Sequence, residues 1–151
     1  MDALDDTIAD IRSAIFALQT RHDIKQVGLR EQVLHVIDEM TGPLGFVPSL
    51  SLTGDLSERV PDDIAANMLG ALRESLSNAA RHAAASRIDV IVEVGSDLIL
   101  VVRDNGVGLR DVTRRSGLAN LAERAEHLGG MLKVGAADGG GTELHWQVPL
   151  P

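Results

Sequence analysis

The sequence has no cysteine, few basic residues and no long apolar run, and each absence excludes a class of protein. Without cysteine there is neither a disulfide framework nor a thiolate metal site, which fits a reducing compartment. The 22 acidic residues outnumber the 14 lysines and arginines, so the net charge is −8. Nucleic acids and anionic membranes attract clustered basic residues, so neither is an expected partner of this segment. No run approaches the roughly 18 apolar residues of a membrane span and no signal segment opens the chain, so we expect a cytoplasmic location.

The length of 151 residues and the hydrophobic content of 44% predict one compact domain with a short helical piece before it. Because a helical pattern begins directly after Met1, we expect the chain to be part of a longer protein. The helical piece has apolar residues at spacings of four and three, which form one seam along a helix: Leu4, Ile8, Ile11, Ile15 and Leu18. The seam predicts a partner helix, although an amphipathic helix packed on its own domain would show the same short pattern.

Two further helices and a strand are predicted in the next part of the chain. A helix with an apolar face from Leu29 to Met40 should stop at Thr41-Gly42-Pro43, and a strand should span Phe46 to Leu52. A long helix should begin at Pro61-Asp62-Asp63, because acidic residues favour a helix N-terminus. Its buried face is predicted to hold Ile64, Met68, Leu72, Leu76, Ala79 and Ala83. The opposite face should hold Asn67, Glu74, Asn78 and Arg81, a pattern that by itself describes a solvated surface.

The strand predicted over Leu98 to Asp104 is the centre of the pattern. Arg87 to Val94 alternates like a half-buried strand, and the nearly all-apolar Leu98 to Asp104 should be its antiparallel, central partner. The central strand ends on the carboxylate of Asp104 and breaks into Asn105-Gly106-Val107-Gly108. Glycines there allow positive φ and the close approach of a ligand, whose edge the carboxylate can bind. The same residues would also make an ordinary turn after a strand, so this motif needs support from others.

The last part of the chain predicts a helix and two more strands. After a polar loop, a helix should open at Gly117 and end at Gly129-Gly130. Strands are expected over Met131 to Val134 and Thr142 to Val148, the second with alternating apolar residues. This order predicts an α/β (α+β) two-layer sandwich, in which helices cover one face of a mixed β-sheet, plus the N-terminal helical segment.

Four segments, in this order, resemble the N, G1, G2 and GT boxes of the GHKL ATPase superfamily. They are Leu72 to Ala83, Asp104 to Gly108, Ser116-Gly117-Leu118 and Gly139-Gly140-Gly141-Thr142. Residues 73–83 and 117–130 look like the ATP-binding domain of sensor histidine kinases that partner NarL-type response regulators, most similar to the mycobacterial oxygen and redox sensors of the DosT and DevS type. The resemblance covers Ser49 to Pro151 well. It implies a Bergerat fold, with residues 23–151 as the catalytic ATP-binding (HATPase) domain and residues 1–22 as the end of a dimerisation helix bundle.

The resemblance implies where each part of ATP would bind. Asp104 would accept a hydrogen bond from the adenine amino group, and Gly106 and Gly108 would admit the base and begin the phosphate path. Thr142 would support that carboxylate or a water beside it. The residues implied to bind the nucleotide are Asn78, Arg81, His82, Asp104, Gly106, Gly108, Gly117, Leu118, Gly141 and Thr142.

A metal and a catalytic group are implied on the long helix. Asn78 offers an amide oxygen to Mg²⁺, a hard ion that prefers oxygen and keeps several waters. Glu74 lies one turn earlier on the same face, so both side chains should point at one spot, and Glu74 is implied to be the catalytic base or to position a water. Arg81 stands where relatives often carry a phosphate-binding lysine, and His82 stands near the nucleotide.

The implied activity is that of a protein histidine kinase, which uses ATP and Mg²⁺ to phosphorylate a histidine on the dimerisation bundle. A NarL-type response regulator would then receive the phosphoryl group. Relatives carry the acceptor in an Arg-X-Leu-His-Asp type motif, a context that none of the five histidines shares: His22, His35, His82, His127 and His145. The isolated chain should therefore be inactive. Relatives also usually show Gly-X-Gly-Leu where this chain has Arg115-Ser116-Gly117-Leu118, which removes one glycine from the phosphate path.

Two alternatives remain open from the sequence. An anti-sigma-factor serine kinase belongs to the same superfamily, although the helical seam from Leu4 to Leu18 speaks against it. A catalytically silent interaction module would keep the fold without using nucleotide. Measured nucleotide binding separates the silent module from the two kinases.

Overall fold

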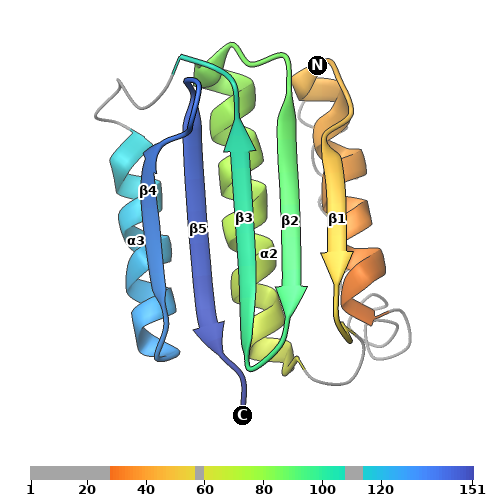
Figure 1. Cartoon of the computed structure of the whole chain (residues 1–151), viewed down its shortest axis with the longest axis vertical. Coiled ribbons are helices and arrows are strands. Elements are labelled where there is room, and N and C mark those ends of the chain that lie inside the picture. The colour runs from red at the N-terminus through yellow and green to blue at the C-terminus, as the bar shows by residue number, and fades with distance from the viewer. Residues whose placement is uncertain (1–27, 57–59, 108–113) are drawn as a thin grey trace, which may run out of the picture.

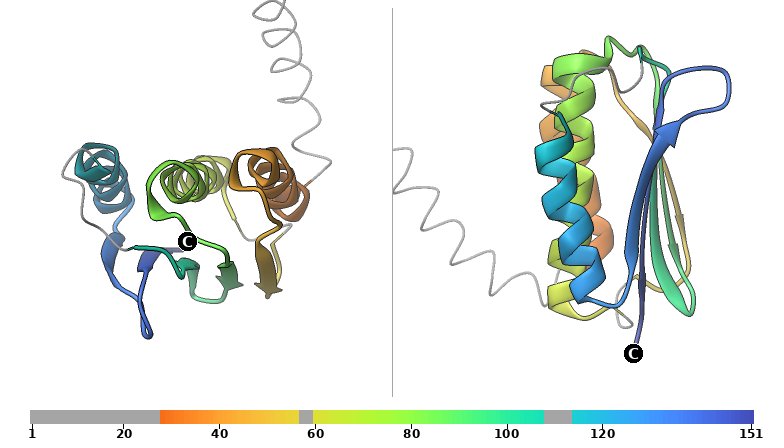
Figure 2. Two further views of the ribbon diagram at one scale, coloured as in Figure 1. Left: turned by 90° about the horizontal axis from the view of Figure 1, so that it is seen from above. Right: turned by 90° about the vertical axis from the view of Figure 1, so that its left-hand side faces the viewer.

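The computed structural model describes residues 28–56, 60–107 and 114–151, with only the backbone described at residues 82, 83 and 114–116. Its elements are a helix over 28–44, β1 (Ser49–Thr53), α2 (Asp62–Asn78), the π-helix η1 (Ala79–Ala83), β2 (Ile88–Val94), β3 (Asp97–Asp104), α3 (Arg114–His127), β4 (Met131–Ala136) and β5 (Thr142–Pro149). The helices all lie on one face of the sheet, which leaves the other face open (Figure 1, Figure 2). The predicted two-layer sandwich is confirmed.

The sheet is mixed and β3 lies at its centre. The strand order is β1-β2-β3-β5-β4, with β1 parallel to β2 and every other pair antiparallel. In this register Asp104, the last residue of β3, pairs with Ile88 on one side and with Thr142 on the other. The end of the central strand β3 therefore lies between the start of β2 and the start of β5, where these strand ends meet.

The core lies between the sheet and α2. Side chains alternate along β2, β3 and β5, and those facing the helices are buried, including Trp146 at 1% exposure. From α2, Met68, Leu72 and Leu76 are fully buried against them. Burying such a side chain contributes about 1.5–3 kcal/mol, so this face fixes α2 on the sheet. The predicted buried face of the long helix is confirmed from Ile64 to Ala79.

The placement of Asn78 opposite that buried face needs correction. Asn78 is only 6% exposed. The reason is that α3 packs beside α2 and covers a side of the helix that the sequence pattern marked as polar. Periodicity shows which face of a helix is apolar, but it does not show which element will cover the rest.

Three predicted element ends are also corrected. The first described helix continues through residue 44, past Thr41, and it ends at Gly45, where φ is +83° and the amide donates to the Thr41 carbonyl at 2.9 Å. The strand predicted from Phe46 begins only at Ser49. Helix α3 begins at Arg114, so Gly117 lies in its first turn and does not open it.

The predicted end of α3 at Gly129-Gly130 is confirmed. The Gly130 amide donates to the Ala125 carbonyl at 2.8 Å and the Gly129 amide donates to the Glu126 carbonyl at 2.9 Å. With φ of +82° at Gly129, this is a Schellman ending, which glycine adopts without a steric penalty.

Some predictions fall outside the described residues. These are the apolar seam from Leu4 to Leu18, the assignment of residues 1–22 to a helix bundle, Gly108, and the side chains of His82 and Ala83. Within the described ranges, no helix combines the length and apolar character that a membrane span needs.

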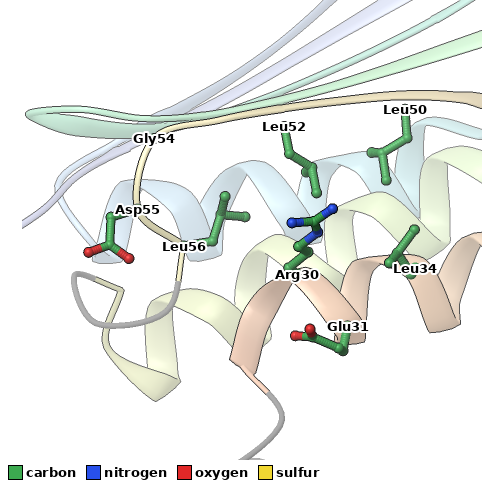
Figure 3. A pocket seen from close by; sticks show the side chains of 8 residues that line it. All are labelled: Arg30, Glu31, Leu34, Leu50, Leu52, Gly54, Asp55 and Leu56. Carbon is green, nitrogen blue, oxygen red and sulfur yellow. The ribbon is translucent and has the colours of Figure 1, made fainter.

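A groove of about 620 Å³ lies between the helix over 28–44 and the edge strand β1 (Figure 3). Its lining residues are Arg30, Glu31, Leu34, Leu50, Leu52, Gly54, Asp55 and Leu56. Leu34 is 45% exposed there. None of the predicted site residues lines this groove, so it is separate from the site described next.

Candidate functional site

The carboxylate of Asp104 is buried and fixed by two backbone amides. Asp104 is 8% exposed, and its Oδ1 accepts hydrogen bonds from the Gly106 amide at 2.8 Å and the Thr142 amide at 3.3 Å. A buried carboxylate needs such partners because loss of hydration is otherwise costly. The pairing of β3 with β5 and the turn after β3 thus hold one oxygen of the carboxylate in place.

Beside this carboxylate lies a buried hydroxyl without a partner. Thr142 is 8% exposed, and its Oγ1 has no hydrogen-bond partner among the described residues. Buried polar groups are normally paired, so an unpaired one next to a carboxylate marks a place for a water or a ligand atom. Asp104 and Thr142 therefore form an acceptor and a hydroxyl that face the same small space.

That space is a cavity of about 20 Å³ under α3. It is lined by Ser75, Asn78, Val102, Asp104, Leu118, Val134, Thr142 and Leu144. A volume of this size has room for about one water. Polar groups lie on the α2 and strand sides, while Leu118, 8% exposed, lines the cavity from α3.

The close packing of the β4–β5 hairpin on Asp104 depends on Gly141. Its φ is +93°, and a Cβ there would collide with the carbonyl oxygen of Asp104. The glycine before Thr142 therefore brings the start of β5 into contact with the end of β3. In the turn after β3, the Gly106 amide donates a hydrogen bond to the Asp104 Oδ1.

Arg81 contacts the amide oxygen that was predicted to bind a metal. The Asn78 Oδ1 accepts a hydrogen bond from the Arg81 Nη2 at 3.4 Å. Arg81 is exposed, and its Nε also donates to the Ser77 carbonyl at 3.4 Å. The oxygen of Asn78, which lines the cavity, thus already faces a cationic group.

Glu74 lies against the first turn of α3. A Cβ at Gly117 would come within 2.5 Å of the Glu74 Oε1, so the missing side chain makes room for the carboxylate. Glu74 is half-buried at this helix contact. Glu74 of α2 and Gly117 of α3 therefore lie where these two helices are in contact.

Four of the predicted site residues line one cavity: Asn78, Asp104, Leu118 and Thr142. Four other residues line the cavity and were not predicted as site residues: Ser75, Val102, Val134 and Leu144. Ser75 had a usable signal, because it precedes Asn78 by three residues and so lies on the same side of α2. The three apolar residues belong to alternating strands, whose pattern marks them as core and not as ligand contacts.

The sequence matches, over residues 66–151, the family of histidine kinase-, DNA gyrase B- and HSP90-like ATPases. The match covers more than half of the chain and includes every residue of the cavity. The chain belongs to this family, and the predicted GHKL membership is confirmed.

Similar curated proteins are sensor kinases. The chain is 33% identical to the sensor histidine kinase LiaS of Bacillus subtilis, over 82% of this chain and 34% of the relative. It is also 33% identical to the nitrate/nitrite sensor protein NarX of Escherichia coli, over 82% of this chain and 21% of the relative. The chain thus spans about a third of these relatives or less.

Similar solved structures confirm the predicted Bergerat fold. The ATP-binding domain of PrrB from Mycobacterium tuberculosis matches with a TM-score of 0.59 at 20% identity, over 83% of this chain and 96% of that one. The blue-light activated histidine kinase of Erythrobacter litoralis EL346 matches with a TM-score of 0.65 at 21% identity, over 98% of this chain and 50% of that one.

Proposed function

We propose that this chain is the ATP-binding catalytic domain of a two-component sensor histidine kinase. It would transfer the γ-phosphoryl group of ATP to a histidine on a dimerisation bundle, for relay to a response regulator. The observation that carries the proposal is the buried Asp104 carboxylate, fixed by two amides beside the unpartnered Thr142 hydroxyl. This pair suits the amino group and ring nitrogen of adenine, with or without a bridging water.

Adenine requires more space than the cavity beside Asp104 provides. Ligand pockets are usually a few hundred Å³, whereas this cavity is about 20 Å³. Leu118 is the only described lining residue that comes from α3. We therefore propose that nucleotide binding moves the start of α3, with Leu118, away from Asp104.

The phosphates and Mg²⁺ would lie toward the end of α2. Mg²⁺ keeps several waters and takes few protein oxygens, so the Asn78 Oδ1 together with phosphate oxygens forms a suitable donor set. The Arg81 guanidinium that contacts this oxygen would turn toward the phosphates. Glu74 would act as the catalytic base or position a water, since catalysis of phosphoryl transfer depends mostly on positioning.

The partners follow from the same proposal. Residues 1–22 would belong to the dimerisation and phosphoacceptor domain of the parent kinase, and the catalytic domain would span residues 23–151. The likeness to NarX supports a NarL-type response regulator as the next acceptor. We further propose that the parent kinase is similar to sensors of the DosT and DevS type and that this domain lies in the cytoplasm.

Radiolabelled ATP tests the proposal. The chain alone should not become labelled, because the acceptor histidine lies on another domain. Adding a bundle fragment with the His-Asp motif should give slow, acid-labile labelling of that fragment, since separate molecules lack the effective concentration of a covalent link. The Asp104→Asn variant serves as the control and should label the fragment far more slowly.

Other outcomes would favour other functions. Acid-labile label on this chain alone would contradict the proposal. Acid-stable label on a serine would favour the anti-sigma-factor kinase. Label on neither protein, together with no measurable ATP binding, would favour the silent module.

A further inference from the structure

The side chain of Asn105, directly after Asp104, makes three hydrogen bonds to Ser86 and Arg87. Its Oδ1 accepts hydrogen bonds from the Ser86 amide at 2.9 Å and the Arg87 amide at 3.0 Å. Its Nδ2 donates to the Ser86 Oγ at 3.0 Å, and its own backbone amide donates to the Arg87 carbonyl at 3.2 Å. Four hydrogen bonds therefore join the turn after β3 to the segment that enters β2.

The segment bound by Asn105 is the exit from the N-box helix. After α2 the chain makes the π-helix η1, and Ala84 then has φ of +50° and ψ of +38°. This left-handed conformation is unfavourable for a residue with a Cβ, and π-helical turns are also rare. Such a backbone persists where its surroundings fix it, and Asn105 fixes the two amides that follow shortly after Ala84.

The other side of Asn105 packs against the β4–β5 hairpin. A Cβ at Gly141 would lie 2.9 Å from the Cα of Asn105, besides colliding with the Asp104 carbonyl oxygen. The backbone of residues 104 and 105 therefore lies between this hairpin and the segment at Ser86 and Arg87. The hairpin contacts this backbone on one side, and the hydrogen bonds of the Asn105 side chain hold it on the other.

We propose that Asn105 is a positioning residue, which fixes the separation between Asp104 and the helix that carries Asn78. This inference rests on the proposed function, in which adenine binds at Asp104 while the phosphates and metal bind near Asn78. One ATP molecule engages both places, so its affinity depends on their separation, whereas adenosine engages only the first. Loss of the Asn105 bonds should therefore weaken Mg-ATP binding and spare adenosine.

Two substitutions and a matched control test this in the whole 151-residue chain. Asn105→Ala removes the three side-chain bonds. Asn105→Asp keeps an acceptor for both amides, and the Ser86 hydroxyl can turn to donate to it. Gln147→Ala removes another amide, which bonds His145 at 3.0 Å and Asp97 at 2.5 Å toward the other end of β5.

Affinities for adenosine and for Mg-ATP are measured by titration calorimetry, at a temperature where circular dichroism shows every variant folded. Asn105→Ala should lower the Mg-ATP affinity about tenfold, the worth of one or two hydrogen bonds, and change the adenosine affinity less than about twofold. Asn105→Asp should restore the ratio of the two affinities, and Gln147→Ala should leave that ratio unchanged. If Asn105→Ala does not fold, Ser86→Ala, which removes one bond, should give a smaller loss of the same kind.

The results separate this inference from the function on which it rests. A wild-type chain that binds neither ligand would overturn both. A wild type that binds both ligands, with an Asn105→Ala variant that loses both affinities equally, would overturn only the positioning role. Failure of Asn105→Asp to restore the ratio would also overturn it.

Discussion

The backbone of Gly141 lies so close to the carbonyl oxygen of Asp104 that no side chain fits between them. Gly141→Ala should therefore displace the start of β5 from Asp104 and withdraw the Thr142 amide that holds the carboxylate. We expect ATP affinity to fall at least about tenfold, the equivalent of 1.4 kcal/mol, in titration calorimetry.

Gly139→Ala is the control for Gly141→Ala, because Gly139 has φ of +83° but open space where a Cβ would lie. A residue with a Cβ in this conformation costs roughly 1–2 kcal/mol of stability, measurable by urea denaturation, and nucleotide affinity should be retained. Equal ATP affinities for the two variants would show that the contact between Gly141 and Asp104 does not matter for binding.

Asp104→Asn should weaken ATP binding by about one to two orders of magnitude, the worth of roughly 1.5–3 kcal/mol for a hydrogen bond to a charged group. The amides of Gly106 and Thr142 would hold the new amide oxygen, so its NH₂ group would face the adenine amino group as a second donor. Titration calorimetry on the two folded proteins measures this. Asp97→Asn, the same change at the other end of β3, should leave the affinity unchanged, and equal affinities for both variants would remove Asp104 from the site.

Asn78→Ala should blunt the Mg²⁺ dependence of ATP binding and leave adenosine binding intact, because the amide oxygen is needed by the metal and not by the base. The measurement is ATP affinity with and without Mg²⁺. Asn67→Ala removes the same type of side chain from the same helix, where Asn67 Nδ2 donates to the Asp63 carbonyl at 2.8 Å, and should keep the full dependence. An unchanged Mg²⁺ dependence in Asn78→Ala would contradict the metal assignment.

The hydrogen bond between Ser49 and Asp89, on the open face of the sheet, should stabilise the fold in a pH-dependent way. The Ser49 Oγ donates to the Asp89 Oδ1 at 2.6 Å, and this bond is the main cause that lowers the pKa of Asp89 below its ordinary 3.8. A carboxyl whose pKa is lower in the folded state stabilises the fold above its unfolded pKa, and this stability is lost as the pH falls through the folded pKa. Ser49→Ala should therefore cost about 1 kcal/mol at pH 7 and less below pH 3.8.

Urea denaturation at pH 7 and at about pH 3 measures this difference. Ser51→Ala, two residues along the same edge strand, is the control and should change stability by less than about 0.5 kcal/mol at both pH values. A cost of Ser49→Ala that does not vary with pH would contradict the role of the charged Asp89.

The sequence by itself determined the type and order of the elements and four of the eight residues that line the cavity. Alternation in β2 and β3, the apolar face of α2 and the glycines at 129–130 are local signals, and the structure follows them. Asp104, Asn78 and Thr142 could also be predicted as site residues, because they belong to short motifs that are recognised by their order in the sequence. Sequence patterns predicted these features correctly because residues close together in the sequence determine them.

Only the tertiary structure decided what the site residues contact. Asn78 is buried because α3 covers the polar side of α2, and Leu118 reaches the cavity by the same packing. The Asn105 side chain bonds residues 18 and 19 positions away, and its partners depend on the register of β2 against β3. Periodicity fixes which face of an element is apolar, but pairing register and helix packing join residues that are distant in sequence, and these decided the geometry of the site.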